Sequence, residues 1–172
     1  MPTDPRVLPL ASCFRLNGRL FENCFRGADD EAALRRPGTT DNSTANHSAA
    51  GNNMAFLGAH LVDARRYLAN LLGPEVDNPF PELAEGESID DFDELPSVER
   101  ILAAWRDMGA TVLDRLEAVP ADHLDRESEQ QFPVDDPTLL GGVAFLVQHE
   151  SYHVGQLAYL RRLVGLGAMT YD

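Results

Sequence analysis

Four stretches of the chain place apolar residues three and four positions apart, which is the period of an amphipathic helix. The first stretch is interrupted by Asn17 and Gly18, which are poor helix formers. No part of the chain alternates convincingly between apolar and polar residues, as a half-buried strand does. The expected helices cover residues 7–26, 52–73, 97–120 and 138–164.

Polar residues at the expected helix starts support these boundaries. Asn52 or Asn53 is a good N-cap for the second helix, and Ser97 is one for the third. Thr138 opens the fourth helix, and Gly165 is its stop signal. Four helices joined by connections of about 20 residues predict an all-α, four-helix bundle with long connecting loops. Because a simple up-down bundle needs only short loops, the order of the helices around the bundle stays open.

The length and the apolar runs set the broad class of protein. A chain of 172 residues can bury a sizeable core, so we expect residues 1–172 to form one domain. We see no signal peptide, and polar residues interrupt every long apolar run, which argues against a membrane span. Cys13 and Cys24 would lie about 16 Å apart along the first helix, too far for a disulfide. Reduced thiols are typical of a cytoplasmic protein.

The charge of the chain is strongly negative. Its formal net charge is −14, and all of its 14 basic residues are arginine. Such a surface repels phosphate backbones, so we expect no nucleic-acid partner. Residues 75–94 hold nine carboxylates among prolines and glycines. We interpret this segment as a solvated loop, because the ligand pattern of an EF-hand calcium loop is absent.

The most informative residues are three histidines. His149 and His153 are one helical turn apart, so their imidazoles can bind one metal ion. They share a helix face with Phe145 and Gln156, and we expect both rings to point into the bundle. There they would be neutral, hydrogen-bonded or metal-bound, and two packed core histidines are the alternative to a metal site. His60 is in phase with apolar residues of the second helix and is expected to face the same interior, completing a set of three.

Three imidazoles leave a further coordination position for water, which is the arrangement of a catalytic rather than a closed structural zinc site. The other two histidines, His47 and His123, fall in predicted loops, and we expect both at the surface.

Two other metal chemistries are excluded by the sequence. Residues 149–153 match the His-Glu-x-x-His pattern of zinc proteases, but the one later candidate ligand is Asp172, and no sheet is predicted to hold a peptide. A di-iron bundle needs two Glu-x-x-His pairs. Glu150 begins one pair, whereas Leu57 and Pro120 stand three residues before the remaining candidate histidines.

Two segments of the chain resemble the DinB-like family of metal-binding four-helix bundles. Residues 52–61 resemble the family's second-helix segment, with an Asn eight residues before the first metal histidine. Residues 149–157 resemble its paired-histidine segment, with Tyr, Gly and Gln at the usual offsets. Phe56 stands where the family often has Trp, and the loop of residues 38–51 looks expanded.

This resemblance implies several properties of the protein. It implies a divalent metal ion, commonly nickel or zinc, held by His60, His149 and His153, and often a homodimer. The family is similar to mycothiol-dependent maleylpyruvate isomerases and bacillithiol transferases, which suggests a low-molecular-weight thiol as co-substrate. It does not supply a substrate, because many members have no assigned reaction.

Three functional hypotheses follow. The first is a metal-dependent enzyme acting on a small molecule, either a thiol transferase or a hydrolase. Gln156 would orient a histidine or the bound water, and Tyr152 would donate a hydrogen bond to the substrate or simply pack as an aromatic. The second is a non-catalytic bundle, with a structural metal or a stress-related binding role. The third is a helix-mediated interaction module. For any three-histidine site, we expect metal loss as the pH falls toward about 6.5.

Overall fold

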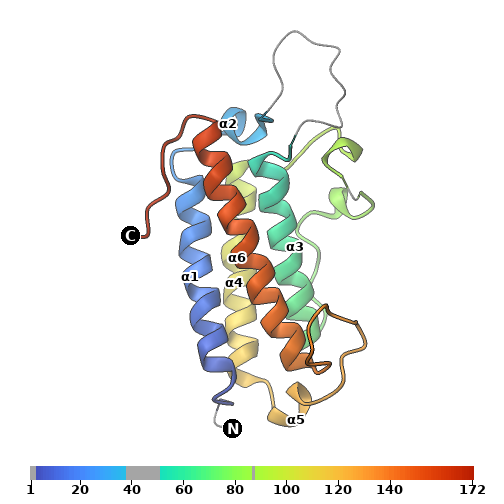
Figure 1. Ribbon diagram of the computed structural model, residues 1–172. Coiled ribbons are helices and arrows are strands. Elements are labelled where there is room, and N and C mark those ends of the chain that lie inside the picture. The colour runs from blue at the N-terminus through green and yellow to red at the C-terminus, as the bar shows by residue number, and fades with distance from the viewer. Residues whose placement is uncertain (1–2, 38–50, 87) are drawn as a thin grey trace.

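A computed structural model describes residues 3–37, 51–86 and 88–172, and Figure 1 shows them as a bundle of long helices. In these residues the only extended pairing is one isolated antiparallel bridge between Glu127 and Thr138. The all-α prediction is therefore confirmed. The long helices are α1 (Val7–Phe25), α3 (Met54–Leu72), α4 (Val98–Ala118) and α6 (Leu139–Leu163). The short ones are α2 (Asp30–Leu34), η2 (Pro81–Leu83), η3 (Ile89–Asp91) and α5 (Ala121–Leu124).

Side-chain caps fix the starts of three long helices. The side chain of Asn53, and not that of Asn52, accepts a hydrogen bond from the third residue of α3. Ser97 accepts in the same way at α4 and Thr138 at α6. Each cap satisfies a backbone N–H that has no partner inside its helix. The predicted boundaries therefore hold to within a few residues.

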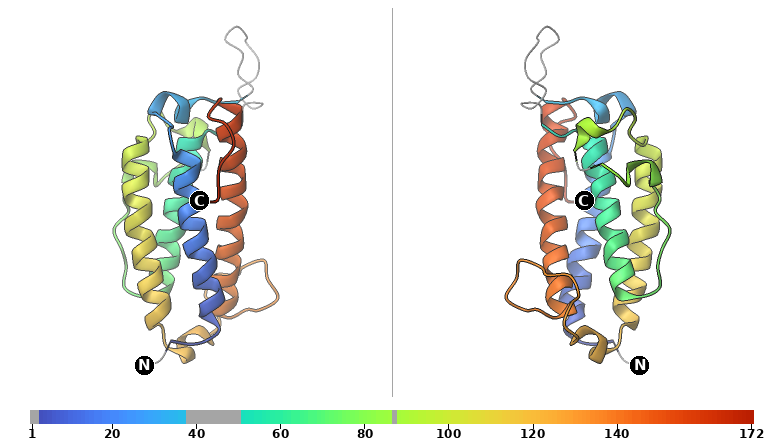
Figure 2. Two further views of the ribbon diagram at one scale, coloured as in Figure 1. Left: turned by 90° about the vertical axis from the view of Figure 1, so that its left-hand side faces the viewer. Right: turned by 90° about the vertical axis from the view of Figure 1, so that its right-hand side faces the viewer.

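The direction of the helices was not predictable from their lengths. In Figures 1 and 2, α1 and α6 run upward, whereas α3 and α4 both run downward. Two successive parallel helices need a connection that returns along the whole bundle, and residues 73–86 and 88–97 make that return on the outside (Figure 1). Around the bundle, α1 packs on α4 and α6, and α3 packs on the same two helices.

The core consists of two apolar clusters, one toward each end of the bundle. One contains Phe21, Phe25 and Ile101, and the other contains Phe14 and Leu116. The level between them holds the buried polar side chains Asn17, Arg65 and Glu150. A polar layer at mid-height therefore divides the apolar interior, and all of its groups must find partners there.

The acidic segment is only partly a solvated loop. Its carboxylates are exposed where the structure describes them, but Phe80 and Ile89 are buried, with exposed fractions of 3% and 7%. Glu82 of this segment forms an ion pair with Arg100 of α4 at 2.8 Å. The prediction missed these buried side chains and this ion pair, because the many carboxylates suggested a segment that does not pack against the bundle. The segment instead covers the outer side of α3.

Other expectations concern the cysteines and the membrane. Cys13 is exposed and Cys24 is buried, and both are free thiols, as their spacing predicted. Burial raises the pKa of Cys24 to about 12, so this thiol stays protonated and unreactive at neutral pH. None of the helices in the described ranges is long and apolar enough to cross a bilayer.

Candidate metal centre

The three histidines singled out in the sequence come together between α3 and α6. The Nε2 atom of His149 lies 3.1 Å from Nε2 of His153 and 3.3 Å from Nε2 of His60. The possible ligand atoms of all three residues lie within 4.8 Å of one another. His60 and His149 are 89 positions apart in the chain, yet each directs its Nε2 atom toward the same point.

Hydrogen bonding alone does not satisfy this arrangement. An imidazole nitrogen has one in-plane position, which holds either a proton or a lone pair. The Nε2 atom of His149 therefore cannot make a good hydrogen bond to both of its neighbours at once. A metal ion would accept a lone pair from each of the three nitrogens. The residues present fit a divalent ion better than they fit a set of packed histidines.

A hydrogen bond sets the tautomer of one ring. The Nδ1 atom of His153 lies 2.6 Å from the amide oxygen of Gln156, one turn further along α6. An amide oxygen only accepts, so Nδ1 carries the proton and Nε2 presents its lone pair to the centre of the site. The predicted orienting role of Gln156 is consistent with this contact.

The prediction that the histidines point into the bundle interior is wrong. His60 is exposed, and His149 and His153 are only half-buried. On α6 the core face is centred on Glu150, about 100° around the helix from His149. The prediction failed because α6 carries apolar residues on nearly every side, so apolar neighbours do not mark its inner face. The candidate site is therefore open to small molecules from outside the bundle.

The surroundings keep two of the rings neutral. Burial, followed by the neighbouring rings of His153 and His60, lowers the pKa of His149 to about 4. His60 is exposed at one side, but desolvation by the protein atoms packed around its ring, followed by the neighbouring ring of His153, also lowers its pKa. A neutral imidazole is the form that binds a metal ion. For His60 and His149 we therefore expect protons to compete with a metal ion at a lower pH than for an ordinary histidine.

These shifts predict how the stability of the metal-free protein depends on pH. Between pH 6.5 and about 4, His149 binds a proton in the unfolded chain but not in the folded protein. The free energy of unfolding therefore falls as the pH falls through this window. Urea unfolding of the metal-free protein at pH 7 and pH 5 measures the fall. We expect a smaller fall for His149→Gln, because this variant lacks the titrating ring. If the free energy of unfolding falls equally in the native protein and in His149→Gln, the lowered pKa does not belong to His149.

Tyr152 lies at the edge of the site. Its side chain is 58% exposed, and its ring stands edge-on to that of His153 with 5.1 Å between the centroids. It is therefore not a packed core aromatic, which was one of the two expected roles. Its hydroxyl as a hydrogen-bond donor to a substrate stays a prediction.

Replacing Gln156 tests its role in holding His153. We expect Gln156→Leu to weaken binding of Ni²⁺ or Zn²⁺ by roughly 10- to 100-fold, the usual effect of losing a partner that orients a metal ligand. Gln156→Glu keeps an acceptor for the Nδ1 proton and serves as the control. Competition titration against a chromophoric chelator measures both affinities. If Gln156→Leu and Gln156→Glu weaken metal binding equally, the hydrogen bond to His153 does not determine the metal affinity.

An ion pair that was not predicted from the sequence lies directly behind the site. Arg65 and Glu150 are 5% and 2% exposed, and they form two hydrogen bonds: Nε to Oε2 at 2.7 Å and Nη2 to Oε1 at 2.9 Å. The guanidinium also lies 3.3 Å from the ring centroid of Trp105 and donates to the carbonyl of Phe14. This network joins all four long helices.

A signal for this network was present in the sequence. Arg65 lies at helical spacing between Leu61 and Leu68, which are both fully buried. A charged residue in such a stripe requires a buried partner of opposite charge. Sequence alone offered many carboxylates, and it could not say which of them faces α3.

Of the two remaining histidines, His47 lies outside the residues that the structure describes, and His123 takes no part in the cluster. His123 was expected in a surface loop, but it lies in α5 and is half-buried, with its Nε2 atom 3.2 Å from the carbonyl oxygen of Leu71. The next residue, Leu124, is fully buried, so the short helix packs against the bundle.

Comparison with known proteins agrees with the fold. The chain is similar to a conserved protein of Enterococcus faecalis whose crystal structure is known, with a TM-score of 0.66 and 14% sequence identity. The match covers 92% of this chain and 96% of that one, and at this identity it concerns the fold alone. No curated protein has a significant match to the chain.

A sequence profile identifies the family. Residues 14–157 match the profile of the DinB superfamily. The matched range includes the four long helices, at least in part, and all three clustered histidines. The chain therefore belongs to the DinB superfamily, as the resemblance of its two histidine segments indicated.

Proposed function

We propose that this protein is a divalent-metal-dependent enzyme that transfers a low-molecular-weight thiol to an electrophilic small molecule. One observation carries the proposal: three histidine Nε2 atoms from α3 and α6 converge at a point where His60 is exposed and the other two residues are half-buried. Three neutral imidazoles are the donor set of catalytic zinc sites, in which a further position remains for a reacting ligand. Nickel and zinc both suit imidazole ligands.

The position of the cluster argues against a purely structural metal. The Arg65–Glu150 ion pair and the apolar core already join α3 to α6. An ion on the outside of that contact would add little to the attachment of the two helices. Structural zinc sites are, in contrast, closed and fully coordinated by protein ligands.

In the proposed reaction the chain's own residues have distinct tasks. His60, His149 and His153 would hold the ion, which would act as a Lewis acid and lower the pKa of the thiol. Gln156 keeps His153 in the tautomer that binds metal. The exposed hydroxyl of Tyr152 is available to a substrate at the site. The thiol sulfur bonds to the electrophilic carbon, the leaving group departs with its bonding electrons, and the thiol proton passes to solvent.

The test has two stages. Elemental analysis of protein purified without a histidine tag should find close to one equivalent of nickel or zinc. The metal-loaded protein should then conjugate an alkyl or aryl halide to mycothiol, bacillithiol or cysteine faster than metal-stripped protein does. The absence of conjugation with every thiol would overturn the transferase proposal, and hydrolysis of an aryl ester would then be the next reaction to assay. A homodimer stays a prediction that light scattering checks.

A further inference from the structure

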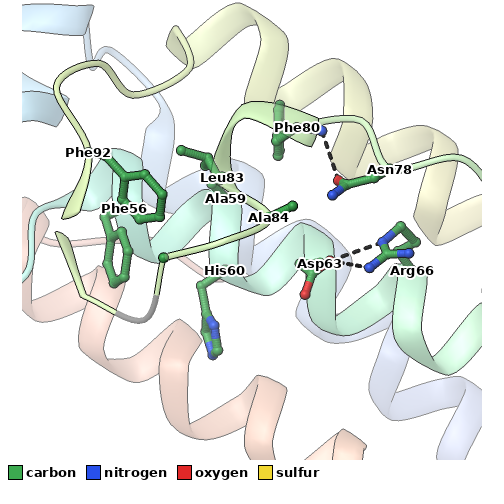
Figure 3. Close-up of a pocket in the computed structure, with 11 residues that line it drawn as sticks. Phe56, Ala59, His60, Asp63, Arg66, Asn78, Phe80, Leu83, Ala84 and Phe92 are labelled. Atoms are coloured by element: carbon green, nitrogen blue, oxygen red, sulfur yellow. Dashed lines mark hydrogen bonds and ion pairs between the residues drawn. The ribbon is translucent and has the colours of Figure 1, made fainter.

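A cavity of about 210 Å³ lies between α3 and a covering segment made of residues 78–86 and 88–92. His60 lines this cavity, whereas His149 and His153 do not, so the cavity meets the histidine cluster through one residue (Figure 3). A molecule inside it would have one end beside the proposed metal ligand.

Aromatic side chains form one end of the cavity. Phe56 of α3 and Phe92 of the covering segment face each other there, with 6.2 Å between the ring centroids and a tilt of 37° (Figure 3). Phe80 also lines the cavity and is 3% exposed. Gly86 lies against the Phe92 ring so closely that a Cβ at this glycine would clash with it. The covering segment is therefore shaped to place an aromatic ring at this position.

The other end of the cavity is polar but carries little net charge. Both the Nε and Nη2 atoms of Arg66 bind Asp63, at 3.0 and 2.9 Å. Asn78 accepts a hydrogen bond from the backbone N–H of Phe80 at 2.9 Å through Oδ1. This leaves the amide nitrogen of Asn78 as a donor, and Figure 3 shows it turned toward the cavity.

We propose that this cavity binds the aromatic ring of a neutral electrophilic substrate, with a hydrogen-bond acceptor of that substrate near Asn78 and its reactive carbon beside His60. The proposal rests on the function proposed above and names its substrate class. The net charge of −14 also favours a neutral molecule over an anionic one. The size is suitable, because an apolar cavity of about 150 Å³ is known to bind benzene.

Binding can be measured without metal or turnover. The probe is 4-fluoroacetophenone, an aromatic ketone, and fluorine NMR of the metal-free protein gives its Kd. We expect Phe92→Ala to raise this Kd about tenfold through the loss of ring contact and apolar burial. Asn78→Asp keeps the acceptor for Phe80 but replaces the donor by a carboxylate, and it should also weaken binding.

The chain offers a matched control. Phe132 is, like Phe92, a half-buried phenylalanine in a connecting segment, but it does not line the cavity. Phe132→Ala should leave the Kd unchanged. If Phe92→Ala unfolds the protein, Ala84→Phe provides a second test, because Ala84 is exposed and its enlarged side chain would fill the cavity. Unchanged binding in the folded cavity variants, or weakening by Phe132→Ala alone, would overturn the proposal.

An activity assay separates this proposal from the proposed function. Thiol conjugation is compared for 1-chloro-2,4-dinitrobenzene, which is aromatic, and iodoacetamide, which is not. Phe92→Ala should raise KM for the aromatic substrate only. Conjugation of neither substrate by the metal-loaded native protein contradicts the transferase function, while the NMR result still decides the cavity. Conjugation of both with unchanged KM in Phe92→Ala contradicts the cavity and leaves the function standing.

Discussion

Replacing His149 by alanine is expected to abolish high-affinity binding of divalent metal. The Nε2 atom of this residue is the central one of the three, with the other two at 3.1 and 3.3 Å. Even a residue that only orients a ligand contributes roughly 10- to 100-fold to metal affinity, so the loss of a ligand should exceed 100-fold. Isothermal titration with Ni²⁺ and Zn²⁺ measures the effect, and metal-dependent activity should disappear with it.

His123→Ala is the matched control for this experiment. His123 is also half-buried and on a helix, but its Nε2 atom lies beside the Leu71 carbonyl at the end of α3 and it is outside the cluster. The control should keep native metal affinity, and His149→Ala should remain folded because His149 is only half-buried. Equal metal binding by native protein and His149→Ala would show that the cluster does not hold the ion.

The second large effect concerns the buried ion pair. We expect Glu150→Ala to lower the free energy of unfolding by about 3–5 kcal/mol, because it leaves the Arg65 guanidinium buried without its counter-charge. The remaining contacts of Arg65, to the Trp105 ring and to the Phe14 carbonyl, do not neutralise it. Urea unfolding at pH 7, monitored by the fluorescence of the buried Trp105, measures the loss.

A double substitution separates burial of a charge from loss of packing. Arg65→Met with Glu150→Leu removes both charges while retaining apolar volume, and replacement of a buried pair in this way is often neutral or stabilising. We therefore expect the double variant to be clearly more stable than Glu150→Ala. As a reference, Glu22→Ala breaks the exposed ion pair with Arg106 and should cost less than about 1 kcal/mol. A double variant as unstable as Glu150→Ala would mean that the network stabilises through its specific hydrogen bonds.

The ion pair and the metal site also have a positional relation. Glu150 is adjacent in sequence to His149, so the contact that fixes α6 against α3 is next to the point where their histidines must meet. This arrangement explains how two helices can hold ring nitrogens 3.3 Å apart outside the core. The buried ion pair fixes the positions of the two helices, while the histidines themselves stay accessible to solvent.

The sequence by itself determined the helices and the identity of the clustered histidines. Apolar spacing and capping residues located the four long helices, since these signals are local and need only neighbouring residues. The separation of four between His149 and His153 places both on one side of a helix in any fold. The choice of His60 as the third member depended on its phase in the second helix and on the family resemblance, and the structure brings it to the other two.

Only the tertiary structure decided which faces are inside. Periodicity shows which residues share a helix face, but the neighbours of that face come from segments far away in the chain. For α6, with apolar residues on most sides, the core face passes through Glu150, and the histidines lie outside it. The pairing of Glu150 with Arg65, the parallel course of α3 and α4, and the cavity beside His60 depend on the same long-range packing. A local pattern carries no information about such contacts, because they join residues that are separated along the chain and meet only when the bundle closes.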